Sequence, residues 1–438
     1  MKKILALMVV FLLVVSAFAG CGSNNSSADN NSEAQSNGSQ DSSPNSDSTE
    51  KTELTFWELS SKQEALEQMV EEFNSTHSDI EVTVSYFEVD GIKDSLKVAA
   101  SSNTLPNMWF NWGGSLGGFY AENDLIYDLS DYADSHGWYD LYNPGALNLC
   151  TLDGKLAGYP RSYNTIGMYY RTDIFEEYGL EVPTTFEEFE NVCAVLKENG
   201  ITPISTAGLN GWHVMRFVEL LVEHYAGAEK HDALNTFATS WDDEDVVQAL
   251  TKYEEFVEKG YLPEGFVTFD PNDTQLLTFS GQAAMDIQGP WYDGNIISEG
   301  QDMEDYDTFA FPSGGTNRMS AFVEMIQLNA NNSEAEVDAS IEFLNFYYSD
   351  ENTEKYSDIY NLPLPKKGAP MPEGMPNVEN LLSMSGENGT FTITDQAFVP
   401  QVADALFDVQ DAIATDAMTP EEGAKTIQAA IEDYFAQQ

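Results

Sequence analysis

The sequence is poor in the residues that most catalytic and metal-binding sites require. Its 438 residues include three cysteines and five histidines, and the histidines show no H-E-x-x-H or comparable metal-site spacing. Only 19 Lys and Arg side chains stand against 73 Asp and Glu, which gives a net charge of −54. This charge argues against nucleic acid or an anionic membrane surface as a partner, because both attract basic proteins. With so few arginines, a phosphate or polycarboxylate ligand is also disfavoured.

Long apolar runs are scarce as well, and the one that is present lies at the start of the chain. The run from Ile4 to Val15 follows two lysines and precedes Ala19-Gly20-Cys21. This order is typical of a secretory signal, and the run is too short to span a bilayer. The sequence Phe-Ala-Gly-Cys resembles the lipobox of bacterial lipoproteins, with Phe18 where that motif more often has Leu. The resemblance implies a signal peptide over residues 1–20 and a lipidated Cys21. The lipidated cysteine would anchor the chain to the outer face of a membrane. The alternative is plain secretion with Cys21 unmodified.

The segment after this cysteine lacks the residues that build a core. From Gly22 to Thr52 it contains no aromatic residue and no Val, Leu, Ile or Met. Such a segment cannot bury enough apolar surface to offset the entropy of ordering it. We therefore expect residues 21–52 to be a lipidated cysteine followed by a flexible tether.

Residues 53–438 alternate between strand and helix patterns. Leu54 to Trp57, Ile80 to Tyr86 and Met108 to Phe110 read as strands, and the first two flank a helix with apolar residues at i, i+3, i+4 and i+7. Further helices are expected over 340–348 and 403–413. The segments Thr185–Glu188 and Thr419–Glu422 have the form of a capping box, which marks a helix start. The order predicts an α/β fold with mostly parallel sheets, and the length predicts two domains.

Seven segments, in this order, resemble the extracellular solute-binding proteins of carbohydrate ABC importers, the family of the maltodextrin-binding proteins. The segments are ELTFW (53–57), NTLPNMWFNW (103–112), DGKLAGYPRSYNTIGMYYRTDIFEEYGL (153–180), VPTTFEEF (182–189), FSGQAAMDIQGPW (279–291), FAFPSGG (309–315) and TPEEGAKTIQAAI (419–431). The resemblance implies a two-lobed periplasmic-binding-protein-like fold, with a hinge that the chain crosses near Pro160, Tyr306 and Tyr356. The implied N-terminal lobe is 53–160 plus 306–355, and the C-terminal lobe is 161–305 plus 356–438.

The same resemblance implies a function without catalysis or a cofactor. A monomer held at the extracellular face of the cell membrane would capture a sugar or oligosaccharide between its lobes and deliver it to ABC permease subunits. A sugar ring has an apolar face and a rim of hydroxyls, so its site needs aromatic faces for stacking together with carboxylates and amides.

The family pattern also implies which residues line the cleft. Its positions correspond here to Glu58, Ser60, Lys62, Asn111, Trp112, Arg161, Tyr163, Asn164, Trp212, Trp291, Phe322 and Glu324. Asp293, close to Trp291, is a further candidate for a hydroxyl partner. One position departs from the pattern, because Leu406 follows Pro400-Gln401 where maltodextrin binders present a Trp. This departure argues against maltodextrin itself as the ligand.

Several alternatives stay open at the level of the sequence. Gly113 to Gly117 matches the G-x-S-x-G motif of hydrolases, so a surface-anchored esterase or glycosidase is the second hypothesis. Trp291 is either a stacking surface or a buried anchor, and His213 is either a structural imidazole or a ligand contact. Cys150 and Cys193 are either paired or free.

Overall fold

The computed structural model describes residues 51–356, 364–371 and 373–437. All of them belong to one unit, Thr49–Gln438. The predicted signal peptide, Cys21 and all but the last two residues of the predicted tether lie outside the described residues.

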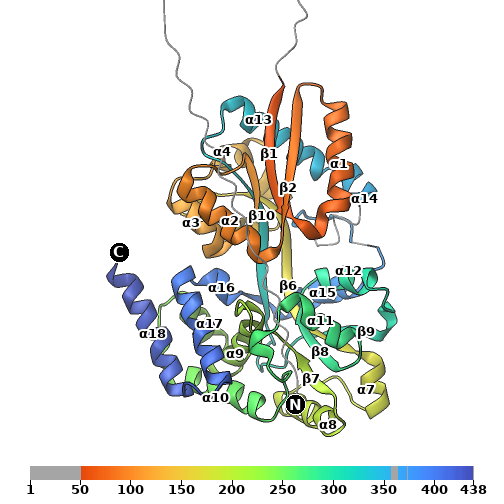
Figure 1. Ribbon diagram of the computed structural model, residues 1–438, viewed down its shortest axis with the longest axis vertical. Helices are drawn as coiled ribbons and strands as arrows, with labels where there is room; N and C mark the ends of the chain where they lie inside the picture. The colour runs from red at the N-terminus through yellow and green to blue at the C-terminus, as the bar shows by residue number, and fades with distance from the viewer. Residues whose placement is uncertain (1–50, 357–363, 372, 438) are drawn as a thin grey trace, which may run out of the picture. The chain divides into compact units, whose positions relative to one another are not determined.

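A mixed β-sheet runs through this unit and connects its two ends (Figure 1). The strands lie in the order β2-β1-β3-β10-β6-β8-β7, with β11 paired to β10 and β9 paired to β6. Their bounds are β1 Thr52–Leu59, β2 Ile80–Phe87, β3 Met108–Trp112, β6 Tyr159–Arg171, β7 Thr202–Ser205, β8 Ala283–Gln288, β9 Tyr306–Phe309, β10 Met319–Leu328 and β11 Thr390–Thr392. A separate hairpin is formed by β4 Thr151–Leu152 and β5 Lys155–Leu156.

The strand directions differ between the ends and the middle of the sheet. At one end β1 is parallel to β2 and β3, and at the other end β7 is parallel to β8. In the middle, β10 is antiparallel to both β3 and β6, and β6 is antiparallel to β8. β10 also pairs in parallel with the short strand β11. β6 and β10 thus connect the two ends in opposite directions.

The helices pack around these two ends (Figure 1). Those that accompany β1, β2 and β3 are α1 Gln63–Thr76, α2 Val89–Ser102, α3 Gly114–Glu122, α4 Ser130–Ser135, α5 Trp138–Leu141, α6 Pro144–Cys150, α13 Glu334–Tyr347 and α14 Asp350–Lys355. Those at the other end are α7 Thr172–Tyr178, α8 Phe186–Glu198, α9 Trp212–Asn235, α10 Glu244–Glu258, α11 Pro271–Phe279, α12 Trp291–Ser298, α15 Pro376–Asn388, α16 Thr394–Ala397, α17 Pro400–Ala414 and α18 Pro420–Ala436. The short 3-10 turns are η1 Ser60–Lys62, η2 Phe266–Thr268 and η3 Met303–Asp305.

The buried apolar side chains form two main cores. The N-terminal core surrounds β1 to β3 and extends to Tyr348, and the C-terminal core runs from Ile166 on β6 to Ile431 on α18. The strand β10 contributes to both, because Phe322 packs in the C-terminal core and Val323 in the N-terminal core. The two cores correspond to two lobes joined through β6 and β10.

The expected lobe boundaries remain a prediction, and the packing bears on one of them. Phe309 and Phe311 lie in the C-terminal core, and β9 pairs with the far half of β6. This favours a crossing from the C-terminal lobe back to the N-terminal lobe within β10 rather than near Tyr306. The third expected crossing, near Tyr356, borders residues 357–363, which lie outside the described residues.

Most local predictions are confirmed. The expected strands are β1, β2 and β3, and the predicted apolar stripe of α1 is buried. Both capping boxes are present, with Thr185 and Glu188 at the start of α8 and Thr419 and Glu422 at the start of α18. The two internal cysteines are free and buried, one in each core.

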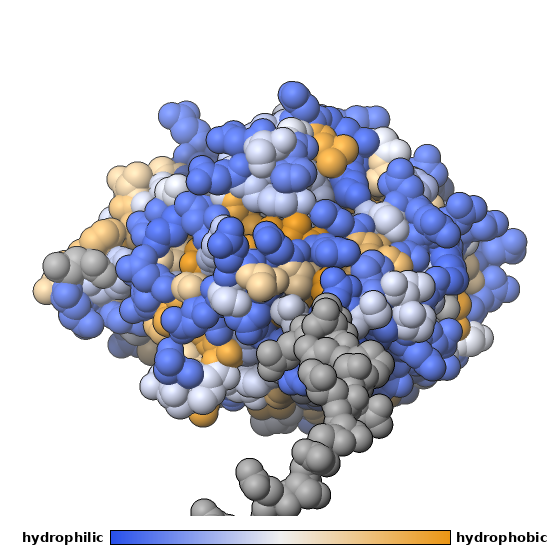
Figure 2. Space-filling view, turned by 90° about the horizontal axis from the view of Figure 1, so that it is seen from above, coloured by the Kyte–Doolittle hydropathy of each residue, from blue (hydrophilic) through white to orange (hydrophobic). Residues whose placement is uncertain are grey.

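The surface agrees with the scarcity of long apolar runs in the sequence. Figure 2 shows that the face seen from above carries mainly hydrophilic residues, with hydrophobic residues in scattered groups. Within residues 51–356, 364–371 and 373–437, we find no helix whose length and apolar character would allow it to cross a bilayer.

Candidate functional site

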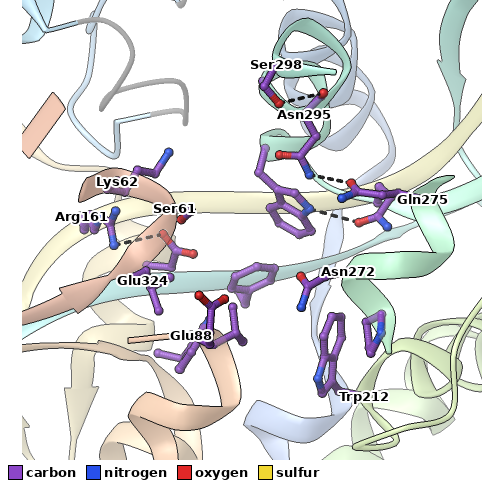
Figure 3. A pocket seen from close by; sticks show the side chains of 18 of the residues that line it. Ser61, Lys62, Glu88, Arg161, Trp212, Asn272, Gln275, Asn295, Ser298 and Glu324 are labelled. Atoms are coloured by element: carbon purple, nitrogen blue, oxygen red, sulfur yellow. Dashed lines mark hydrogen bonds and ion pairs between the residues drawn. The ribbon is translucent and has the colours of Figure 1, made fainter. Parts of the chain in front are cut away.

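A cleft of about 860 Å³ lies between the two lobes, beside the connecting strands β6 and β10. Its lining comes from both lobes, as Figure 3 shows: Ser61, Lys62, Glu88, Arg161 and Glu324 face Trp212, Asn272, Gln275 and Asn295 across it. The volume falls within the range of about 300–1,000 Å³ that is usual for small-molecule sites. Much of the lining follows the carboxyl ends of strands β1, β2, β3 and β8, which is where α/β sheets place ligands.

The N-terminal lobe supplies a polar rim with one aromatic face. The turn η1 directly follows β1, and Ser60 on this turn donates its hydroxyl to Glu88 Oε1 at 2.7 Å. Lys93 on α2 lies over the Trp112 ring, with Nζ 4.9 Å from the ring centroid, and it also donates to Asp90 Oδ1 at 3.0 Å. The ring of Trp112 is therefore held on one side by a cation.

A buried ionic cluster lies at the base of the cleft, where the two lobes join. Arg161 on β6 donates to Glu58 Oε1 at 2.9 Å, and the same nitrogen lies 3.9 Å from Glu324 Oε2 on β10. Ser162 donates its hydroxyl to Glu324 Oε2 at 2.9 Å. Burial raises the pKa of Glu58, and the charge of Arg161 opposes this shift. Since the cluster links β1, β6 and β10, it fixes the hinge strands and presents Arg161 and Glu324 to the cleft.

The C-terminal lobe supplies an aromatic wall built around one guanidinium. Arg216 Cζ lies 4.7 Å from the ring centroid of Trp212 and 5.2 Å from that of Trp291. Trp291 in turn contacts Phe322 of β10, with ring centroids 5.8 Å apart. Burial lowers the pKa of Arg216 to about 10, although nearby carboxylates oppose the shift. The guanidinium therefore stays charged at neutral pH, and cation–π attraction holds both indoles.

The local sequence explains why Trp291 faces the cleft. The strand β8 ends at Gln288, and α12 begins at Trp291 after Gly289 and Pro290. A Cβ atom on Gly289 would lie 2.3 Å from the Trp291 ring, so only glycine lets the ring lie over this backbone. The indole also donates Nε1–H to Gln288 Oε1 at 3.1 Å, and that oxygen accepts a second bond from Arg216 Nη1 at 3.2 Å. The ring of Trp291 is thus supported by the backbone at Gly289 and fixed at its edge by the hydrogen bond to Gln288.

His213 lies behind this wall and is fully buried. Its Nε2 lies 3.2 Å from Asp286 Oδ1, which also accepts a bond from Gln288 Nε2 at 3.2 Å. Burial lowers the pKa of His213, and the Asp286 carboxylate opposes the shift. The geometry favours a structural imidazole that supports Gln288, and through it Trp291.

The structure brings together seven of the thirteen candidate residues along the cleft. They are Lys62, Trp112, Arg161, Trp212, Trp291, Phe322 and Glu324. Glu58 and Ser60 lie directly behind this lining, where Glu58 binds Arg161 and Ser60 binds Glu88. Both side chains therefore contact residues that line the cleft, and their predicted role in ligand binding remains a prediction.

The other four candidates point elsewhere. Asn111 donates to Gln327 Oε1 at 2.8 Å, and Asn164 donates to Ser162 Oγ at 2.9 Å, both in buried positions. Tyr163 faces a second pocket of about 310 Å³ and bonds with Thr390. Asp293 is fully buried, and its two oxygens each accept from Asn377 at 3.0 Å. These four side chains do not line the cleft, and each makes at least one hydrogen bond within the protein.

Several cleft residues were not among the sequence candidates. They are Glu88, Lys93, Arg216, Asn272, Gln275, Asn295, Asp395 and Gln396. A signal existed for Glu88, which directly follows β2 and thus occupies the carboxyl end of a parallel strand. Asn295 also had a local signal, because it lies four residues after Trp291 on α12. The residues of α11 and α16 come from other parts of the chain, and no local pattern groups them with the candidates.

The hydrolase motif takes up a structural role. Ser115 donates its hydroxyl to the main-chain oxygen of Asp395 at 3.1 Å, rather than to an imidazole. Gly114 approaches Gln396 so closely that a Cβ atom would lie 2.2 Å from the carbonyl oxygen of that residue. The motif therefore lets α3 pack against α16. Among the described residues, no three His, Cys, Asp or Glu side chains lie close enough together to hold a metal ion.

Comparison with known proteins supports this fold. A solved chitin oligosaccharide binding protein superimposes with a TM-score of 0.80 at 22% identity, covering 87% of this chain and 98% of that one. An uncharacterized ABC transporter extracellular-binding protein of Pyrococcus horikoshii is 24% identical over 252 residues, 56% of this chain and 55% of the relative. A galactooligosaccharide-binding protein of Bacillus subtilis is 23% identical over 323 residues, 72% of this chain and 73% of the relative. The chain thus spans little more than half of the Pyrococcus protein.

The expected two-lobed periplasmic-binding-protein-like fold is confirmed by this structural likeness. Residues 68–380 match the model of the family described as bacterial extracellular solute-binding protein. This is a family of binding proteins, which leaves the hydrolase hypothesis without support. The chain belongs to the bacterial extracellular solute-binding proteins.

Proposed function

We propose that the chain is the substrate-binding protein of an ABC importer and that it captures a sugar or oligosaccharide in the interlobe cleft. The observation that carries this proposal is the composition of the two walls. Trp212, Trp291 and Phe322 present aromatic surfaces, while Glu88 and Glu324 supply carboxylates opposite them. Aromatic faces suit the C–H face of a sugar ring, and carboxylates and amides suit its hydroxyls.

The relatives support the same class of ligand. Two of them are named for binding a galactooligosaccharide and a chitin oligosaccharide. The departure from maltodextrin binders at Leu406 also has a structural counterpart, since this side chain packs in the C-terminal core. We therefore propose an oligosaccharide other than a maltodextrin.

Delivery and location belong to the same proposal. Lipidation at Cys21 would hold the chain at the extracellular face of the membrane, and residues 22–52 would give it reach. A monomer whose lobes close around the sugar by hinge motion would present a closed form to ABC permease subunits. The ligand-binding residues that we propose are the seven candidates along the cleft, with Glu58 and Ser60 in support.

A thermal-shift screen of the purified protein tests the proposal. A ligand at one hundred times its dissociation constant adds about 2.7 kcal/mol to the free energy of unfolding. We expect a rise in melting temperature with at least one of raffinose, maltotriose, a chitin trisaccharide and a galactooligosaccharide, with maltotriose the weakest. An unchanged melting temperature with every sugar tested, together with turnover of an ester or a glycoside, would contradict it.

A further inference from the structure

A hydrogen bond outside the cleft lining joins the two lobes. Asn210 Nδ2 donates to Asp90 Oδ2 at 2.8 Å, and the two residues are 120 positions apart in the chain. Asp90 lies in the first turn of α2, in the N-terminal lobe. Asn210 lies just before α9, which packs in the C-terminal core. Neither residue lines the cleft, so this bond connects the lobes to each other and not to a ligand.

The loop that carries Asn210 is packed tightly. Asn210 has a φ of 68° and Gly211 a φ of 73°, so both residues lie in the left-handed region. Among residues with a side chain, Asn is one of the few that tolerate this region well. A Cβ atom on Gly211 would lie 2.3 Å from the ring of Phe407 on α17. The Asn210 amide therefore projects from a loop that is fixed to the C-terminal lobe.

The bond also connects the aromatic surfaces of the two lobes. Asp90 Oδ1 accepts from Lys93 Nζ at 3.0 Å, and this nitrogen lies 4.9 Å from the ring centroid of Trp112. On the other side, the main-chain oxygen of Asn210 accepts from the main-chain N–H of Trp212 at 2.9 Å. A continuous set of contacts thus runs from Trp112 in one lobe to Trp212 in the other. A hinge opening that separates these two indoles stretches the Asp90–Asn210 bond.

Charge on α2 acts in the same direction as this bond. Burial raises the pKa of Asp395 on α16, and the charge of Lys93 opposes this shift. Burial also raises the pKa of Asp404 on α17, where the charge of Lys97 opposes it. Two lysines of α2 therefore attract carboxylates of the C-terminal lobe, in a chain with 19 basic against 73 acidic side chains.

We infer that the Asp90–Asn210 bond is a latch that holds the lobes together and slows the release of a bound ligand. The inference rests on the proposed function and adds to it a control on the opening of the cleft. A rotation of the lobes about β6 and β10 has to break this bond, because one partner lies on each lobe. Affinity falls with the fraction of molecules in the binding-competent state, so loss of the latch weakens binding without removing a ligand contact.

Two substitutions at Asn210 test the latch without straining the loop. Asn210→Gly removes the amide and suits a positive φ. Asn210→Asp keeps the shape, tolerates the same backbone conformation and places a second carboxylate against Asp90. The matched control is Asn103→Gly. Asn103 is also exposed and has a φ of 56°, but its side chain accepts from Asn331 within the N-terminal lobe.

Two measurements follow the latch in each protein. Small-angle X-ray scattering gives the radius of gyration without sugar. Stopped-flow fluorescence gives the dissociation rate of the tightest binder among raffinose, maltotriose, a chitin trisaccharide and a galactooligosaccharide.

The latch predicts the same order of variants in both measurements. Asn210→Gly should enlarge the radius of gyration and raise the dissociation rate about fivefold, which corresponds to the loss of one ordinary hydrogen bond. Asn210→Asp should have larger effects in about 0.01 M NaCl and approach Asn210→Gly in about 0.5 M NaCl, because salt screens the added repulsion. Asn103→Gly should match wild type in both measurements.

The outcomes separate the latch from the proposed function. The latch requires both changes in Asn210→Gly, and either change alone, or neither, overturns it while sugar binding by wild type leaves the proposed function standing. If wild type binds none of the four sugars, the proposed function fails for these ligands. The radius of gyration then decides the latch, because a larger value in Asn210→Gly supports it and an equal value overturns it. Equal changes in Asn103→Gly would also contradict the latch, since they would reflect a general effect of glycine.

Discussion

The residues that give the cleft its chemistry depend on neighbours that fix their orientation. Trp291 is the clearest case, since its ring lies over Gly289 and its Nε1 is bonded to Gln288. Arg216 then holds this ring and that of Trp212 by cation–π contacts. The aromatic wall is therefore preorganised, and a ligand need not bear the entropic cost of ordering it.

Truncation of Trp291 should separate binding from folding. We predict that Trp291→Ala weakens sugar binding by more than about tenfold, because the stacking face is lost, while the melting temperature of the free protein changes little. Trp57→Ala, which removes another partly buried Trp outside the cleft lining, is the matched control and should leave affinity unchanged. Titration calorimetry measures both. A Trp291→Ala protein that fails to fold would instead make this residue a core anchor.

Glu219 predicts a dependence of stability on pH. Burial raises its pKa from 4.5 to about 8, although hydrogen bonds from Ser320 and Thr394 oppose the shift. Between these two values the folded state keeps a proton that the unfolded state has lost. The free energy of unfolding contributed by this group therefore falls as pH rises through the window, by up to about 1.4 kcal/mol per pH unit.

The substitution Glu219→Gln removes this titration while keeping a similar shape. Urea unfolding at pH 5, 6, 7 and 8 should show the variant gaining stability over wild type as pH increases. Glu229→Gln, on an exposed position of the same helix α9, is the control and should follow wild type at every pH. A difference between Glu219→Gln and wild type that is the same at all four values would contradict the raised pKa.

How far the site residues could be predicted depended on the kind of signal they leave. Trp291 lies in one of the seven segments with a recognisable order, and Arg161 follows a recognisable Tyr-Pro pair. The family resemblance located both, and it pointed to Trp212 by its position near the start of a helix. Arg216 and Asp395 carry no local signature, because their role comes from the contact between α9 and α16. Asp293 was misplaced by sequence proximity to Trp291, since the helix α12 turns its side chain toward Asn377.

Among the elements, the helix starts were the most predictable and the crossing strands the least. Capping boxes are local, and those of α8 and α18 appear as expected. The strand β6 extends over Tyr159–Arg171 and serves both lobes, which a periodicity cannot reveal because nearly all of its residues are buried. The contact of Glu219 with Thr394 joins residues 175 positions apart and likewise leaves no pattern in the sequence.

The cap of α18 provides a test at this scale. Thr419 Oγ1 accepts from the main-chain N–H of Glu422, while the Glu422 carboxylate accepts from Thr419 N. Thr419→Ala should lower the free energy of unfolding by about 1 kcal/mol, because the N-terminal donors of the helix lose their partner. Thr426→Ala, on the exposed face of the same helix, should change it by less than about 0.5 kcal/mol. Equal losses for the two variants in urea unfolding would contradict the capping role.

At the scale of the whole molecule, the strongest property is the excess of acidic side chains. A net charge of −54 disfavours the compact state by self-repulsion. Ion pairs relieve only part of this, since the described part of the chain has few cations to distribute among many carboxylates.

Salt should therefore stabilise this protein. We predict that the melting temperature at pH 7 rises as NaCl increases from about 0.01 to 0.5 M, because the Debye length falls from roughly 30 Å to below 8 Å. The rise should be smaller at about pH 5, where part of the carboxylates are protonated. Differential scanning calorimetry measures both series. A melting temperature that falls with salt at pH 7 would show that attractive ion pairs outweigh the repulsion.

The central claim, that a sugar ring is held between the lobes against the wall of Trp212, Arg216 and Trp291, is tested most directly by a crystal structure. The protein would be crystallised with the sugar that raises its melting temperature most. The account predicts one ring stacked on Trp291 within the cleft, with hydroxyls bonded to carboxylates of the lining such as Glu88 and Glu324. A sugar bound outside the cleft, or within it but away from these indole rings, would contradict the account.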